Sequence, residues 1–170
     1  ADIVRALRGV PEAVARAIDT EPQVAAIARE LADRRSMFFI GRRFGHPVAL
    51  EGALKLKEIS YVHAEGYPAG ELKHGPIAML DPSIPLLAIA TASPTYPKLI
   101  SNIEEVRARG VEVVAVASEG DIRIAAHAEH VIHVPRMREE FSPLVDVVPT
   151  QLFAYHVAVA LGRDVDQPRN

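Results

Sequence analysis

Cysteine is absent from the 170-residue sequence, the net charge is only −3, and aromatic residues make up 5% of the chain. Without cysteine there are no disulfides, no thiolate metal ligands and no cysteine nucleophile. A chain of this length can bury roughly 70% of its unfolded surface, so it needs no cross-links to fold. We therefore expect one domain spanning residues 1–170, located in the cytoplasm.

Long apolar runs and clusters of basic residues are also missing. The run from Ile84 to Ala92 is interrupted by proline and is too short to span a bilayer. No secretory signal pattern opens the chain, and no basic stripe suggests nucleic acid as a partner. Because the first residue is Ala1 rather than Met, we expect the sequence to be a fragment of a larger protein.

Apolar runs and helical patterns alternate along the sequence. Short runs of the kind that form buried parallel strands occupy Met37–Ile40, Pro85–Ala90, Val111–Ala117 and Val131–Val134. Helical periodicity covers Pro11–Ala32 (with a kink at Pro22), Val48–Ile59, Tyr96–Arg109 and Pro143–Leu161. This alternation predicts an α/β fold around a mostly parallel sheet.

The turns that follow the strands are where such sheets bind ligands, and they occupy Gly41–Pro47, Thr91–Pro94 and Ala117–Asp121. Hydroxyls at Thr91, Ser93 and Thr95 precede a predicted helix. They are suited either to holding an anion or simply to capping that helix. The sequence leaves both interpretations open.

A charged face is predicted on the Val48–Ile59 helix. Glu51, Lys55 and Glu58 follow i, i+4, i+7 spacing, which brings acid, base and acid together. Most faces of this kind are solvated surfaces whose ion pairs contribute little stability. Spacing alone does not distinguish such a surface from an acid–base site.

The stretch Tyr61–His74, rich in glycine, proline and charge, is predicted to be a functional loop. Histidine is a residue type that commonly exchanges protons in catalysis, so His74 and a nearby carboxylate are candidates for acid–base work. Metal binding by His63 and Glu65 is the weaker interpretation, because their spacing matches no metal-binding motif. We therefore expect no metal and no other cofactor.

Three segments carry a resemblance to a known family. ALEGALKLKEISYVHAEGYPAGELKHGP (Ala49–Pro76), SNIEEVRARG (Ser101–Gly110) and DVDQPRN (Asp164–Asn170) resemble the second sugar-isomerase (SIS) domain of the glucosamine-6-phosphate synthase family. This family is also called glutamine–fructose-6-phosphate aminotransferase, isomerizing. The resemblance implies a flavodoxin-like, three-layer α/β/α sandwich with a five-stranded parallel sheet.

The resemblance also implies an activity. The family joins ammonia, released from glutamine by a separate glutaminase domain, to fructose 6-phosphate and isomerises the product to glucosamine 6-phosphate. Glu58 would be the base that moves the proton between C1 and C2, and Lys55 would stabilise the developing charge. His74 would open the sugar ring in the site of a neighbouring subunit. The implied partners are the phosphorylated sugar, a first SIS domain, the glutaminase domain and a second copy of the chain in a homodimer.

Parts of that machinery are missing from the sequence. The family's nucleophilic cysteine is absent, and its phosphate-binding loop lies in the first SIS domain. Its tail lysine falls beyond Asn170. We therefore expect little turnover by the chain alone and phosphate-binding residues outside it. The alternatives are a stand-alone phosphosugar isomerase and a non-catalytic phosphosugar-binding module.

Overall fold

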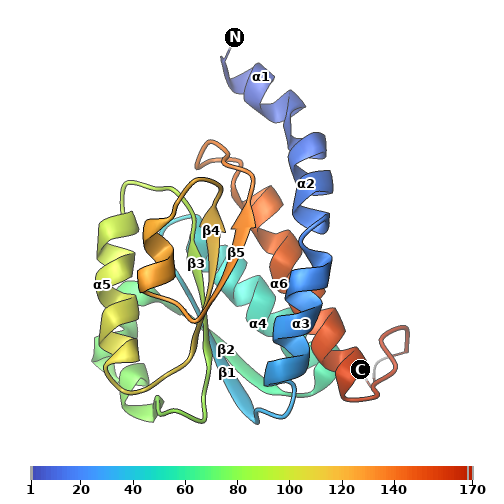
Figure 1. Cartoon of the computed structure of the whole chain (residues 1–170), viewed down its shortest axis with the longest axis vertical. Coiled ribbons are helices and arrows are strands. Elements are labelled where there is room, and N and C mark those ends of the chain that lie inside the picture. Colours follow the sequence, from blue (N-terminus) through green and yellow to red (C-terminus); the bar gives the residue numbers. More distant parts are fainter. Residues whose placement is uncertain (1, 168, 170) are drawn as a thin grey trace.

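A five-stranded parallel sheet of order β2-β1-β3-β4-β5 forms the centre of the computed structural model, which describes residues 2–167 and 169 (Figure 1). The strands are β1 (Ser36–Gly41), β2 (His63–Pro68), β3 (Leu86–Ala90), β4 (Val113–Ser118) and β5 (His130–Val134). All neighbouring strands pair in parallel. The four strands predicted from apolar runs are confirmed as β1, β3, β4 and β5.

Helices cover both faces of this sheet and complete the predicted three-layer sandwich. One face packs against α2 (Val10–Ile18), α3 (Glu21–Leu31), α4 (Gly45–Ser60) and α6 (Pro143–Ala160). The other face packs against α5 (Tyr96–Arg107) and the 3₁₀ helices η1 (Ala69–His74), η2 (Pro76–Met79) and η3 (Arg123–Ala126). Each face of the sheet has its own hydrophobic core, and successive residues of a strand point into opposite cores. Phe39 therefore faces the α4 side and Phe38 faces the α5 side.

The N-terminal helices differ from the single kinked helix predicted over Pro11–Ala32. The helix is broken at Asp19 and Thr20, and Pro22 lies in the first turn of α3. Proline is favourable there because a first-turn N–H has no partner within the helix. A further helix, α1 (Asp2–Arg8), has no buried residue and extends beyond the sheet (Figure 1).

The prediction that Tyr61–His74 forms a loop is wrong, because this stretch forms β2 and η1. As an edge strand, β2 buries only Ala64 fully and therefore lacks a continuous apolar run. Gly66 allows α4 to approach closely, since a Cβ atom there would lie 2.8 Å from the Leu50 Cα. The glycine, proline and polar residues of this stretch therefore reflect an edge strand that is only partly buried, not a loop.

The direction of the chain places the two ends of α4 at opposite edges of the sheet. α4 begins beyond the carboxyl end of β1 and ends just before His63, which pairs with Ser36 at the start of β1. The last turn of α4 therefore lies at the amino edge. η1 instead follows Pro68, which pairs with Gly41 at the carboxyl end of β1. Among the described residues, every helix is too short or too polar to pass through a membrane.

Candidate acid–base site

Lys55 and Glu58 form a close ion pair on the exposed face of α4. The Lys55 Nζ lies 2.6 Å from Glu58 Oε2 and 3.9 Å from Glu51 Oε1. The hydrogen bond to Glu58 is the largest factor that raises the pKa of Lys55 above its ordinary value. Lys55 is therefore a cation at neutral pH, and the predicted grouping of the three side chains on one helix face is confirmed.

The same face of α4 exposes apolar side chains beside the charged ones. Leu50 is 46% and Leu54 is 42% exposed, whereas Leu56 on the opposite side of the helix is buried. Roughly a third of the Lys55 and Glu58 side-chain surface is accessible. Leu50 and Leu54 therefore form an apolar border beside the ion pair.

Tyr61 ends α4 and holds the C-terminal tail against it. Its backbone is left-handed, with φ of 65°, which stops the helix one turn beyond Glu58. The guanidinium groups of Arg163 and Arg169 lie 5.5 and 4.6 Å from the Tyr61 ring centroid. The Tyr61 hydroxyl also accepts the backbone N–H of Arg169 at 3.0 Å. The tail thus packs against the C-terminal end of α4, a contact that residue spacing does not predict.

His74 lies apart from this face within a single chain. Its Nδ1 is 2.7 Å from Glu71 Oε2, and 72% of its side chain is exposed. Leu72 of the same helix packs in the α5-side core, whereas Leu56 of α4 packs in the opposite core. The sheet therefore separates His74 from Lys55 and Glu58, and the three do not converge in one copy.

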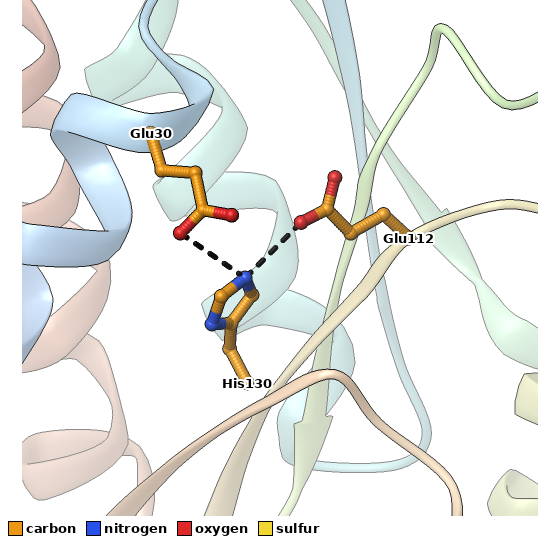
Figure 2. A group of neighbouring side chains, drawn as sticks. All are labelled: Glu30, Glu112 and His130. Carbon is orange, nitrogen blue, oxygen red and sulfur yellow. Dashed lines mark hydrogen bonds and ion pairs between the residues drawn. The ribbon is translucent and has the colours of Figure 1, made fainter.

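One group of side chains has donor atoms spaced as metal ligands would be. Glu30, Glu112 and His130 each offer an atom within 4.8 Å of the others, and the His130 Nε2 faces both carboxylates (Figure 2). The distances from this nitrogen are 3.1 Å to Glu112 and 3.8 Å to Glu30. Arg34 adds a cation 3.4 Å from the other Glu112 oxygen, so Glu112 already has a hydrogen-bond partner in His130 and an ion-pair partner in Arg34. The pair considered from sequence, His63 and Glu65, lies 3.3 Å apart on β2.

The strand order and the helices on both faces define a doubly wound α/β domain. Residues 30–161 match the SIS domain family model, and the chain belongs to the SIS domain family. It is 52% identical over 168 residues to the glutamine–fructose-6-phosphate aminotransferase (isomerizing) of Thermus thermophilus. It is 47% identical over 169 residues to the protein of that name from Aquifex aeolicus.

Each of these two relatives matches 99% of the chain, which spans 28% of the relative's own length. Among solved structures, the C-terminal domain of glucosamine-fructose-6-phosphate aminotransferase from Francisella tularensis superposes with a TM-score of 0.91 at 35% identity. That match covers 98% of this chain and 47% of the other. The fold and the family implied by the sequence resemblance are therefore confirmed.

Proposed function

We propose that residues 1–170 form one SIS domain of a larger isomerizing aminotransferase that makes glucosamine 6-phosphate from fructose 6-phosphate and ammonia derived from glutamine. The observation that carries this proposal is the 52% identity to a relative of that name over 99% of the chain. The Lys55–Glu58 pair supplies chemistry that fits it. The parent protein acts in the cytoplasm as a homodimer.

Glu58 is the base that moves the proton between C1 and C2 of the sugar. A carboxylate in contact with the reacting carbon typically contributes about 10²- to 10⁴-fold to such a transfer. Lys55 stays protonated beside it and stabilises negative charge on the sugar oxygen as the proton leaves. The contact with Glu71 holds the His74 imidazole by Nδ1 and leaves Nε2 to act on the ring oxygen.

His74 acts in the site of a partner subunit. The separation of His74 from Glu58 by the sheet supports this assignment, because one copy does not bring the two groups together. The exposed Leu50 and Leu54 beside Lys55 support a covering surface from another domain. The sugar phosphate is held by groups outside this chain.

A domain exchange tests the proposal. The matching segment of the Thermus thermophilus relative is replaced by this chain, and glucosamine 6-phosphate formation is measured. We expect the chimera to be active, Lys55→Met to lower kcat at least about 10²-fold, and Lys57→Met to leave it unchanged. Lys57 is the matched control, since it lies on α4 but is exposed away from the ion pair. A chimera that folds and dimerises without activity contradicts the proposal.

Mixed dimers test the role of His74. Neither Glu58→Gln nor His74→Ala chimeras are expected to be active alone. In a statistical mixture, half of the dimers are mixed and each has one intact site, so about a quarter of the activity returns. If heterodimers are shown to form but regain no activity, Glu58 and His74 of one site come from the same chain.

The isolated chain is expected to make no glucosamine 6-phosphate from fructose 6-phosphate and ammonia. Conversion of fructose 6-phosphate to glucose 6-phosphate by the chain alone would instead identify a stand-alone isomerase.

A further inference from the structure

His74 lies at the end of η1, a short helix that depends on its surroundings for its position. Helices of the 3₁₀ type have poorer hydrogen-bond geometry than α-helices and persist only as short pieces. Ala69 and Leu72 anchor η1 in the α5-side core. The exposed imidazole of His74 is hydrogen-bonded to Glu71 of the same helix, which orients the ring within η1 but does not fix η1 relative to the sheet. Polar contacts with the rest of the fold supply that further support.

The end of α5 and the turn after it hold the chain on both sides of His74. The Glu105 Oε1 lies 2.7 Å from the Nζ of Lys73, the residue just before His74. The Arg109 Nε donates a hydrogen bond at 3.1 Å to the carbonyl of Ile77, three residues after His74. The segment that carries His74 is therefore attached to α5 at two points.

Asn102 joins these contacts to the turn after β1. Its side chain is 8% exposed, and its Oδ1 accepts hydrogen bonds from Arg42 Nε at 3.1 Å and from Arg42 Nη2 at 2.9 Å. Its Nδ2 donates to Glu105 Oε2 at 3.4 Å. An amide can accept from a guanidinium and donate to a carboxylate at the same time. An aspartate would place like charge beside Glu105, and a leucine would leave the guanidinium without this acceptor.

Arg42 carries the network to the beginning of η1. A Cβ atom at Gly70 would lie 3.1 Å from Arg42 Nη2, so the guanidinium packs directly against the backbone of this helix. The hydrogen bond from Lys73 is the largest factor that lowers the pKa of Glu105, so this carboxylate is ionised at neutral pH. The network therefore contacts η1 near its start and near its end.

We propose that Arg42, Asn102 and Glu105 are positioning residues that hold His74 where the site of a partner subunit requires it. This inference rests on the function proposed above, in which His74 acts on the sugar. Arg42 supports the beginning of η1, Glu105 supports its end, and Asn102 fixes the two supports relative to each other. Such support matters because a displacement of about 1 Å can lower the rate of a positioned reaction about 10²-fold.

Amide hydrogen exchange in the chain measures the support of η1 independently of activity. We expect exchange in residues 69–79 to become about tenfold faster in Asn102→Ala, which removes hydrogen bonds to two charged groups. Glu105→Gln is expected to speed it about threefold, since the pair with Lys73 is partly exposed. Exchange in β3 and β4 stays unchanged. Unchanged exchange in residues 69–79, or an equal increase throughout the sheet, overturns the proposal.

Ser101→Ala is the matched control for Asn102→Ala. Ser101 is the neighbouring residue on α5 and is exposed, and its hydroxyl donates to the Pro97 carbonyl of the same helix. The control removes a polar side chain from α5 without touching the network. We expect it to leave the exchange of residues 69–79 unchanged.

The mixed dimers described above distinguish a positioning role from a general structural one. In the active site of such a dimer, the Glu58→Gln chain supplies His74 and the His74→Ala chain supplies Glu58. Asn102→Ala in the chain that supplies His74 is expected to lower the recovered kcat at least about tenfold. The same change in the other chain leaves the recovered activity unchanged, as does Ser101→Ala in either chain.

The outcomes separate this inference from the proposed function. An equal loss from Asn102→Ala in either chain overturns the positioning role, and so does the absence of any loss. If mixed dimers without Asn102→Ala regain no activity, the role proposed for His74 fails instead, and amide exchange alone decides whether the network holds η1 in place.

Discussion

Asp146 makes the stability of the protein depend on pH. This carboxylate lies in the first turn of α6, is 1% exposed, and accepts a hydrogen bond from the Thr91 Oγ1 at 2.8 Å. Burial raises its pKa from the ordinary value of 3.8 to about 6, although the hydrogen bonds from Thr91 and Ser142 oppose the rise. The folded protein therefore holds this proton more tightly than the unfolded chain does.

The sign and size of the effect follow from that difference. A raised carboxyl pKa contributes stability that is fully present below pH 3.8 and is lost as the pH rises through about 6. One pKa unit corresponds to about 1.4 kcal/mol, so the loss is about 3 kcal/mol above pH 7. Asp146→Asn removes the charge, and its amide oxygen still accepts the Thr91 hydrogen bond. We expect the variant to be more stable than the wild type by about 2–3 kcal/mol at pH 8 and about equally stable near pH 4.

Urea unfolding followed by circular dichroism between pH 4 and pH 8 measures this difference. Asp33→Asn is the matched control, because the Asp33 side chain is 89% exposed. The control is expected to follow the wild-type curve. An Asp146→Asn variant that is less stable at pH 8, or whose stability changes with pH as the wild type does, would refute the reasoning.

Three further changes have defined outcomes. Gly41→Ala places a Cβ 2.2 Å from the Gly45 carbonyl oxygen. We therefore expect the free energy of unfolding to fall by about 3 kcal/mol, or the protein not to fold. Wild-type stability in urea contradicts this. Tyr61→Leu removes the contacts of Arg163 and Arg169 with the aromatic ring. We expect faster proteolysis of residues 162–169 and a free energy of unfolding lower by about 1 kcal/mol. Unchanged cleavage contradicts this. Lys55→Met is expected to raise stability or leave it within about 0.5 kcal/mol, because exposed ion pairs contribute little; a larger loss in thermal unfolding shows a structural role.

The central strands were predictable because both of their faces are buried. In β1, β3 and β4 nearly every side chain is buried, so each reads as a continuous apolar run. β2 was missed because it is an edge strand with one fully buried residue. Its glycine and proline, which suggested a loop, instead suit the edge position and the close approach of α4.

The candidate site was predictable only where it depends on local spacing. Helical periodicity brings Lys55 and Glu58 together in any helix that contains them. The position of His74 depends on which face of the sheet η1 covers, and residue spacing carries no such information. The contact between Tyr61 and Arg169 joins residues 108 positions apart, so local patterns do not reveal it. A cavity at the carboxyl edge of the sheet is lined by residues of two turns, Thr91–Pro94 and Ala117–Asp121. The sequence predicts each turn separately but does not show that the two lie side by side.

The most direct test of the central claim is proton transfer by Glu58 in the chimera that carries this chain. Turnover of fructose 6-phosphate deuterated at C1 measures the transfer step through its isotope effect and through loss of label to solvent. We predict that Glu58→Gln slows the transfer at least about 10²-fold while sugar binding and dimer formation persist. A Glu58→Gln chimera that transfers the label at the unmodified rate would contradict the account.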